Sequence, residues 1–252
     1  MRFPTFVLML TCLVSNVAIG QSWQPLFDGT SFAGWQNGKG EPVSAKAWEV
    51  VDGMLHLDRT KGTGGNLLTA REFGDFELVF EWKVAPKANN GIKYRVRDFD
   101  GRTLGLEYQV IDDFGRPQLT ADHKTASIYD IVEAKAHEVL KPAGEFNRGR
   151  ILVRQNHIEH WLNGHLIASA DVGSETWQQD IANSKFNDVE GFGLNQQGRI
   201  MLTDHNDETW YRNIFIREFG AGTEALSATG SGHSSACCCP PRRRLLGRLF
   251  RH

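Results

Sequence analysis

Apolar and polar residues alternate over several short stretches of this chain, and the clearest of these runs from Phe76 to Lys83. Phe76, Leu78, Phe80 and Trp82 stand at every second position, with mostly charged residues between them. A repeat of two is the period of a β-strand, because successive side chains of a strand point to opposite faces. The pattern therefore predicts a half-buried strand.

Two pairs of apolar stretches are joined by dipeptides that favour a tight turn. Asp-Gly and Asn-Gly are strong signals of a β-hairpin, since both residues tolerate a positive φ. The sequence predicts a hairpin at each pair. The stretches are 48–51 and 54–57 around Asp52-Gly53, and 157–162 and 165–168 around Asn163-Gly164.

Residues 22 to about 219 share this character, with short runs of Val, Ile, Phe, Trp and Tyr between Gly, Asn and Asp. Late strands are expected over 200–203 and 211–216, and 128–140 is the best place for a short helix or an ordered loop. Many short strands with little helix predict an all-β sandwich or jelly roll over residues 21–219. The four cysteines, at 12 and 237–239, lie outside it, so the fold must rest on its core.

The two ends of the chain differ in composition from this domain. Arg2, an apolar run over 6–17 and small residues at 18–20 predict a signal peptide over residues 1–20, and export to the periplasm or the extracellular space. A membrane anchor is the alternative, but the run is shorter than the roughly 20 residues of a span. We expect no transmembrane segment in the mature chain. Residues 220–252 predict a flexible Gly/Ser linker and a disordered Cys/Arg-rich tail, with metal, disulfide or lipid contacts as alternatives.

The formal net charge of the chain is −2, and 23% of its residues are charged. This balance is ordinary for a globular protein and lacks the strong basic excess of a nucleic-acid-binding domain. We therefore expect no nucleic-acid partner. The sequence indicates no particular oligomeric state.

Charged residues stand inside two of the expected strands, and no familiar nucleophile motif accompanies them. In 91–96, the two-residue period places Lys93 and Arg95 on one face, and in 106–110 it places Glu107 and Gln109 on one face. A charged strand face in an all-β domain is either solvated or lines a cleft. The opposite face is expected to belong to the core.

Asp and His also gather in segments that read as turns or loops. Asp112-Asp113, Asp122-His123 and 204–207 with His205 can each hold a metal or transfer protons, and each is also what a polar turn looks like. No cofactor is assigned, and a divalent metal stays open. His160 beside Trp161 suits either a platform for a sugar ring or a buried aromatic hairpin.

Seven motifs in order give the chain a resemblance to a known family. Together they resemble the 3-keto-disaccharide hydrolase domain family over about residues 22–218. One departure is Thr203, where the family usually has Gln, and the arginine-rich tail lies outside the family pattern. The motifs are 26–30 with Gly34-Trp35, 89–95, 107–113, 128–130, 141–147, 157–164, and 202–205 with 211–214.

The resemblance implies a concanavalin A-like fold, a two-sheet antiparallel jelly roll, and a carbohydrate substrate whose sugar carries a ketone at C3. The ketone makes the C2 proton acidic, so that C2 deprotonation, elimination of the aglycone and hydration give net hydrolysis. For this chemistry we expect Lys93, Glu107 and His205 to be catalytic, because an enolate needs a cation and proton transfer needs a base and an acid. We expect substrate contacts from Asn90, Arg95, Gln109, Asp112, Tyr129 and His160.

Two other interpretations of the same residues stay open. Direct hydrolysis by two carboxylates would need Glu107 and Asp112 in one cleft, and a β-bulge would be required because the two-residue period separates their faces. A non-catalytic, lectin-like carbohydrate-binding module would use the same fold without titratable groups in its cleft.

Overall fold

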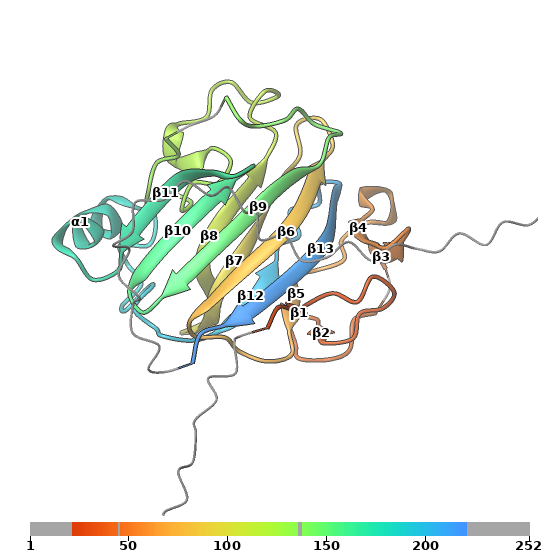
Figure 1. Cartoon of the computed structure of the whole chain (residues 1–252), viewed down its shortest axis with the longest axis horizontal. Helices are drawn as coiled ribbons and strands as arrows, with labels where there is room; N and C mark the ends of the chain where they lie inside the picture. Colours follow the sequence, from red (N-terminus) through yellow and green to blue (C-terminus); the bar gives the residue numbers. More distant parts are fainter. Residues whose placement is uncertain (1–21, 45, 136–137, 221–252) are drawn as a thin grey trace, which may run out of the picture.

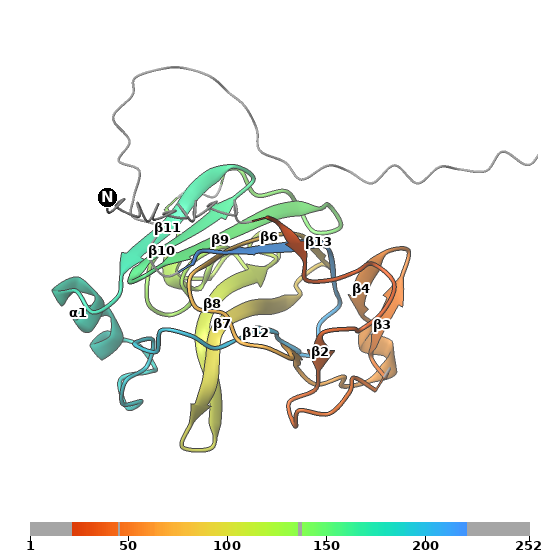
Figure 2. The same ribbon diagram turned by 60° about the horizontal axis from the view of Figure 1, so that its bottom comes forward.

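The computed structural model describes residues 22–44, 46–135 and 138–220. These residues form two antiparallel sheets that lie face to face, which confirms the expected all-β sandwich (Figure 1, Figure 2). The expected signal peptide at 1–20 and the tail from 221 lie outside the described residues.

The larger sheet has eight strands, seven of which follow one another as hydrogen-bonded neighbours. Figure 1 shows this sheet in front, with β6 and β13 near its middle. In spatial order it contains β11 (His165–Asp171), β10 (His157–Leu162), β9 (Asn147–Arg154), β6 (Phe76–Val84), β13 (Thr209–Glu218), β4 (Met54–Leu57) and β3 (Trp48–Val51), and β1 (Gln24–Pro25) pairs with β13.

The smaller sheet has five strands, and its longest pair, β7 and β8, forms one edge. Residues 126–129 run beside β8, because the Ala126 amide donates to the carbonyl of Gln109 at 2.9 Å and the Tyr129 amide donates to that of Glu107 at 3.0 Å. The order of the strands is β2 (Trp35–Gln36), β5 (Leu67–Thr69), β12 (Arg199–Leu202), β7 (Asn89–Phe99) and β8 (Arg102–Ile111).

The two predicted hairpins are confirmed as β3–β4 and β10–β11. Asp52 and Gly53 have φ of 50° and 75°, and Asn163 and Gly164 have φ of 50° and 90°. Positive φ at both central positions matches the right-handed twist of the flanking strands, which is why these dipeptides fix the register.

Helix forms at a different place from the one considered in the sequence. The described part of 128–140 contains no helix; Ile128 bridges to Tyr108 and Val132 instead, so its backbone bonds go to a strand edge. An α-helix, α1 (Glu175–Asn183), begins where the Ser174 hydroxyl accepts from the Trp177 amide at 3.1 Å. Two short 3₁₀ turns, η1 (Arg59–Lys61) and η2 (Ala121–His123), complete the helical content of the described residues.

No helix within the described ranges is long and apolar enough to cross a lipid bilayer.

A large aromatic core fills the space between the sheets. Phe80 of β6 meets Tyr108 of β8 edge to face, with ring centroids 5.2 Å apart. Such rings bury a large apolar area each, which suits a domain whose body has no cysteine. The largest fully buried side chains include Trp48, Trp82, Tyr94, Tyr108, Tyr211, Phe73 and Phe76.

A β-bulge interrupts β7 at Arg95. The pairing with β8 shifts between Tyr94 and Arg97, and Arg95 has a φ of 50°. A bulge adds one residue to a strand and so moves every later side chain to the other face. The bulge therefore separates the face of Lys93 from that of Arg95.

Candidate functional site

Lys93 and Glu107 stand opposite each other on the outer face of the smaller sheet. The two residues are in register between β7 and β8, and the Lys93 Nζ lies 3.6 Å from the Glu107 Oε2. Their side chains are only 17% and 7% exposed. This is a largely covered ion pair rather than a solvated charged face, and it confirms the expectation that Lys93 and Glu107 share a face.

Gly91 makes room for the carboxylate of Glu107. A Cβ placed on Gly91 would lie 1.9 Å from the Glu107 Oε1, so the carboxylate rests directly over the glycine backbone. The φ of Gly91 lies outside the left-handed region, so the residue is required for space and not for its backbone conformation. Gln109 pairs with Gly91 and follows Glu107 on the same face.

Gln109 connects β7 and β8, beneath the Lys93–Glu107 pair, to a neighbouring loop. Its side-chain amide donates to the Asn89 Oδ1 at 3.2 Å and to the backbone carbonyl of His123 at 3.3 Å. The side chain is buried. Gln109 therefore positions the loop of His123, which the sequence alone does not indicate.

Tyr129 flanks Glu107 on the side away from Lys93. Burial raises the pKa of the Tyr129 hydroxyl, and the negative charges of Glu107, Asp130 and Asp122 raise it further. These charges act on one phenol because Tyr129 sits among them. The prediction that Tyr129 contacts substrate stays open, and its place beside Glu107 suits that role.

Lys185 completes this group, and sequence reasoning missed it. Its ammonium lies 4.1 Å from the centroid of the Tyr129 ring. Burial lowers the pKa of Lys185, as does the charge of Lys93, whereas Glu107 and Asp130 raise it. Lys185 follows α1 in a polar segment far from the other residues in sequence, so no local pattern marks it.

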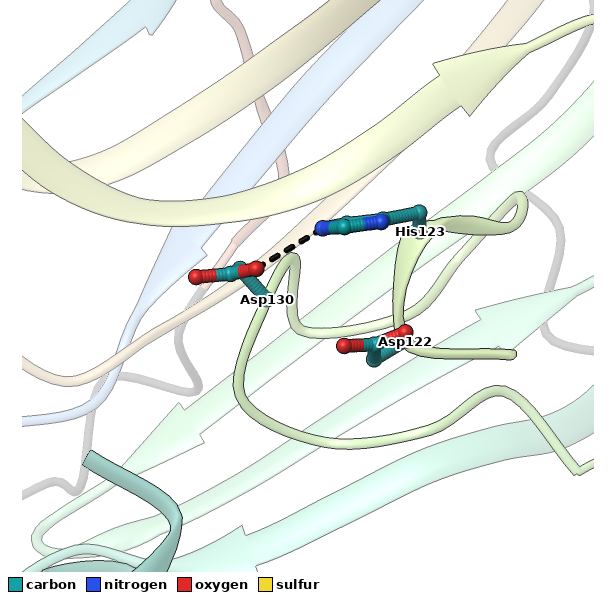
Figure 3. A group of neighbouring side chains, drawn as sticks. All are labelled: Asp122, His123 and Asp130. Carbon is teal, nitrogen blue, oxygen red and sulfur yellow. Dashed lines mark hydrogen bonds and ion pairs between the residues drawn. The ribbon is translucent and has the colours of Figure 1, made fainter. Parts of the chain in front are cut away.

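His123 and Asp130 form a hydrogen-bonded pair next to Tyr129. Figure 3 shows the imidazole and the Asp130 carboxylate pointing toward each other, and the Nε2–Oδ1 distance is 2.7 Å. The second ring nitrogen, Nδ1, lies 3.0 Å from the Thr120 hydroxyl. The imidazole also lies against Tyr129, with ring centroids 4.8 Å apart.

Asp122 lies beside this pair, and the three side chains are the candidate metal ligands among the described residues. Their donor atoms all lie within 4.8 Å of one another. Both ring nitrogens of His123 already have partners, and the Asp130 Oδ2 accepts the Lys185 amide at 2.6 Å. A metal held by His123 Nε2 and Asp130 Oδ1 would have to replace the hydrogen bond between these two atoms.

An acidic pocket of about 290 Å³ lies next to Asp130. Asp122 and Asp130 form part of its lining, together with Asp180 and Asn183 of α1. Burial raises the pKa of Asp180. The pocket is large enough for a small-molecule group at the lower end of the usual size range, about 300 Å³.

His205 is exposed on the loop between β12 and β13. Its backbone amide donates to the Asn90 Oδ1 at 3.1 Å. Within the described ranges, no hydrogen bond or ion pair joins its side chain to Lys93 or Glu107. The catalytic role expected for His205 stays a prediction.

Asn90 does not lie where a sugar hydroxyl could reach it. Its side chain is fully buried on the inner face, donates to the Asp207 carbonyl at 2.8 Å and to the Thr209 hydroxyl, and accepts from the His205 amide. The expectation of a substrate contact is wrong. Asn90 instead fixes the loop that carries His205.

Asp112 is also a structural residue. Its Oδ2 accepts the Lys87 amide at 2.7 Å, in the turn before β7. The register of β8 is regular from Glu107 to Ile111, so the bulge that would aim Asp112 into the site is absent from this stretch. The regular register gives no support to the Glu107–Asp112 hydrolytic pair, and the substrate contact expected of Asp112 stays a prediction.

Arg95 points between the sheets because of the bulge in β7. Its side chain is fully buried, and the Nη2 donates to the Gln155 carbonyl at 2.8 Å and lies 3.5 Å from the Asp75 Oδ1. Both partners belong to the larger sheet or its turns. The expectation that Arg95 shares the face of Lys93 and contacts substrate is therefore wrong.

His160 is a buried residue that hydrogen-bonds within the chain, and it offers no surface on which a sugar ring could pack. Its Nδ1 lies 3.1 Å from the carbonyls of Ala126 and Ser127, and its Nε2 lies 2.9 Å from the Tyr94 hydroxyl. Carbonyls only accept, so the proton sits on Nδ1, and burial lowers the pKa of His160 to about 4. Its expected substrate contact is wrong; His160 holds the segment that leads to Tyr129.

Thr203, the departure from the family pattern, lies beside Gly91. Its hydroxyl donates to the Gly91 carbonyl at 3.2 Å, and its amide donates to the same oxygen at 3.0 Å. Thr203 is buried and therefore ties the segment after β12 to the glycine that lies under Glu107.

Comparisons with known proteins are consistent with this arrangement. Residues 22–217 match the model of the 3-keto-alpha-glucoside-1,2-lyase-like domain. A 3-keto-disaccharide hydrolase from Bacteroides thetaiotaomicron is 31% identical, over 76% of this chain and 77% of that protein. A Parabacteroides distasonis crystal structure, provisionally described as a glycosyl hydrolase, superposes with a TM-score of 0.70 at 27% identity, over 79% of this chain and 94% of that chain. The β-agarase B of Zobellia galactanivorans shares the fold, with a TM-score of 0.50 at 12% identity, over 79% of this chain and 93% of that chain.

Proposed function

The chain belongs to the 3-keto-alpha-glucoside-1,2-lyase-like domain family, and from this membership we propose that it cleaves glycosides whose sugar carries a ketone at C3. The relative named a 3-keto-disaccharide hydrolase supports a glycoside hydrolase-like function in general. The observation that carries the finer proposal is the covered Lys93–Glu107 pair on the outer face of β7 and β8.

The pair suits removal of a proton next to a ketone. Glu107 takes the proton from C2, and the electrons of the C–H bond move onto the C3 oxygen as an enolate. Lys93, whose ammonium lies 3.6 Å from the Glu107 carboxylate, stabilises this oxygen. A positioned base contributes roughly 10²–10⁴-fold in rate, and a positioned charge at a developing oxyanion contributes about 10²–10³-fold.

The enolate then expels the aglycone from C1, and water adds back to C1 of the unsaturated sugar. The proton returns to C2, so the net reaction is hydrolysis. Tyr129 and Lys185 lie beside Glu107, and in this proposal they contact the sugar. His205, on the loop after β12, is the proton-transfer partner that the sequence suggests.

The test compares a 3-keto-glycoside with its unoxidised parent, using the purified domain in heavy water. We expect aglycone release from the ketone alone, with solvent deuterium at C2 of the released sugar beyond spontaneous exchange. Binding without cleavage would favour the lectin-like alternative. Cleavage without enzyme-dependent C2 label would exclude elimination.

We also propose that the protein works outside the cytoplasm after removal of residues 1–20. N-terminal sequencing of exported material should find a first residue near Gln21. Retention of Met1 on that material would contradict cleavage.

A further inference from the structure

The His123–Asp130 pair takes no part in the removal of the C2 proton, and His123 lies against Tyr129, the neighbour of Glu107. We propose that His123, oriented by Asp130, is the general acid that protonates the glycosidic oxygen as the aglycone leaves. This inference rests on the proposed function and adds a catalytic residue to it.

The position of His123 follows from a short series of contacts. Tyr129 donates its amide to the Glu107 carbonyl at 3.0 Å, and the Tyr129 ring lies 4.8 Å from the imidazole of His123. The Gln109 side chain, next to Glu107 on the same face, holds the His123 carbonyl at 3.3 Å. Tyr129 therefore connects Glu107 to the imidazole of His123, and Gln109 connects the strand of Glu107 to the backbone of His123.

The orientation of the imidazole is fixed from one side only. Asp130 is held at both oxygens, by the Lys185 amide at 2.6 Å and by the His123 Nε2 at 2.7 Å. The other ring nitrogen meets the hydroxyl of Thr120, an exposed residue. A substrate oxygen can take the place of this hydroxyl, whereas Asp130 keeps the ring in position. This is the arrangement of a histidine that transfers protons while a carboxylate orients it.

The proposed step balances in atoms and charge. The C1–O bond breaks, its electron pair goes to the glycosidic oxygen, and that oxygen takes the proton of His123. The enolate electrons form the C1=C2 bond, conjugated to the C3 carbonyl, while Glu107 holds the C2 proton. Water then adds to C1 and gives a proton to His123, and Glu107 returns its proton to C2.

The experiment compares two 3-keto-glycosides that differ in the leaving group, an alkyl aglycone and a p-nitrophenyl aglycone. A nitrophenolate leaves without protonation, but an alkoxide does not. We expect His123→Gln to reduce kcat on the alkyl glycoside by about 10²–10³-fold and on the nitrophenyl glycoside by less than about tenfold. His165→Gln, at an exposed position of β11, is the matched control and should reduce neither.

Asp130→Asn provides a second variant should His123→Gln fold poorly. Asp130 has a φ of 63°, which asparagine tolerates, so the backbone can stay as it is. It should show the same aglycone dependence with a smaller loss. Equal losses on both glycosides in both variants, or aglycone dependence in His205→Gln and not in His123→Gln, would overturn the inference.

The same assay separates this inference from the proposed function. His123→Gln should still exchange the C2 proton of the 3-keto-glycoside with solvent, because Glu107 and Lys93 remain. A wild-type enzyme that neither exchanges C2 nor releases an aglycone would overturn the proposed function, and the inference with it. An active wild type with an aglycone-independent His123→Gln would overturn the inference alone.

Discussion

On the outer face of the smaller sheet, Lys93 and Glu107 lie 3.6 Å apart with Tyr129 and Lys185 beside them, whereas between the sheets Arg95 and His160 bond to backbone carbonyls. Both groups are polar and largely covered. The inner residues donate to fixed acceptors of the chain, and each joins two segments. The outer residues meet mainly one another.

This difference separates a role in stability from a role in chemistry. A polar group whose hydrogen bonds are all made within the chain has little left to offer a substrate, but its removal leaves buried partners unsatisfied. A pair of opposite charges that meets mainly its own partner keeps the capacity to bind new atoms. We therefore expect substitutions on the outer face to change the rate, and substitution of the fully hydrogen-bonded His160 between the sheets to change the free energy of unfolding.

The largest effect is expected for Glu107→Gln. It should reduce kcat on a 3-keto-glycoside by about 10²–10³-fold, because the amide cannot take the C2 proton. The melting temperature should stay within a few degrees of wild type. Steady-state kinetics with circular dichroism checks both, and Glu72→Gln, at an exposed position before β6, is the control. A large loss of stability together with the loss of rate would remove the distinction between the two faces.

His160→Gln should lower stability and change the rate little, which is the reverse of Glu107→Gln. It removes the contacts of one ring with Tyr94, Ala126 and Ser127, and should lower the free energy of unfolding by about 2–4 kcal/mol. At a temperature where the variant is folded, kcat should change less than about tenfold. Urea unfolding and kinetics measure the two quantities. An intact stability with a lost activity would return His160 to the substrate site.

The stability of the wild type should also depend on pH through His160. Its pKa is lowered from 6.5 to about 4, so the unfolded chain binds a proton that the folded chain excludes. The free energy of unfolding should therefore fall as the pH falls from about 6.5 toward 4, by up to about 3 kcal/mol. Urea unfolding at several pH values should show the gap between wild type and His160→Gln narrowing over this window. A constant gap would mean that His160 is charged in the fold.

A smaller effect is expected for Gly91→Ala, which tests the space under Glu107. The added Cβ would lie 1.9 Å from the Glu107 Oε1, so the carboxylate must move. Displacement of this kind costs about 1–3 kcal/mol in stability, and we expect kcat to fall by at least roughly tenfold. Gly38→Ala, which meets nothing within 4 Å, should do neither. Unchanged kinetics for Gly91→Ala would show that the carboxylate need not rest over Gly91.

The smallest effect is expected for Arg95→Met. Among the described residues the Nε and Nη1 of Arg95 have no hydrogen-bond partner, so part of its burial is uncompensated. Replacing a buried charge with an apolar chain of similar length is often close to neutral, and we expect a change within about 1 kcal/mol. KM should stay within threefold of the wild-type value, on the order of RT in binding free energy. A tenfold rise in KM would place Arg95 at the substrate after all.

The alternation of residues was enough to predict the strands, and Asp52-Gly53 and Asn163-Gly164 were enough to predict two turns. Both signals are local, because the strand period and the turn conformation depend on adjacent residues. The same alternation placed Arg95 on the wrong face, since a single inserted residue at a bulge inverts every later position. No local pattern marks that insertion in β7.

The site could be predicted only in part, because some of its contacts follow from local patterns and others do not. Lys93 and Glu107 could be found because each stands inside a regular strand and the two strands pair directly. Lys185 and the bond from His123 to Asp130 depend on how distant loops meet, which the sequence does not encode locally. Residue type also does not show whether a polar side chain stabilises the fold, as those of Asn90 and His160 do, or contacts a substrate.

The segment at 126–129 brings Tyr129 to Glu107, and it also covers an edge of the sheet. The amides of Ala126 and Tyr129 occupy the carbonyls of Gln109 and Glu107 that would otherwise face outward from β8. An uncovered strand edge is a template for pairing with another molecule and a route to aggregation. A shortened version of this domain that lacked the segment would therefore tend to associate through β8, even if its core stayed intact.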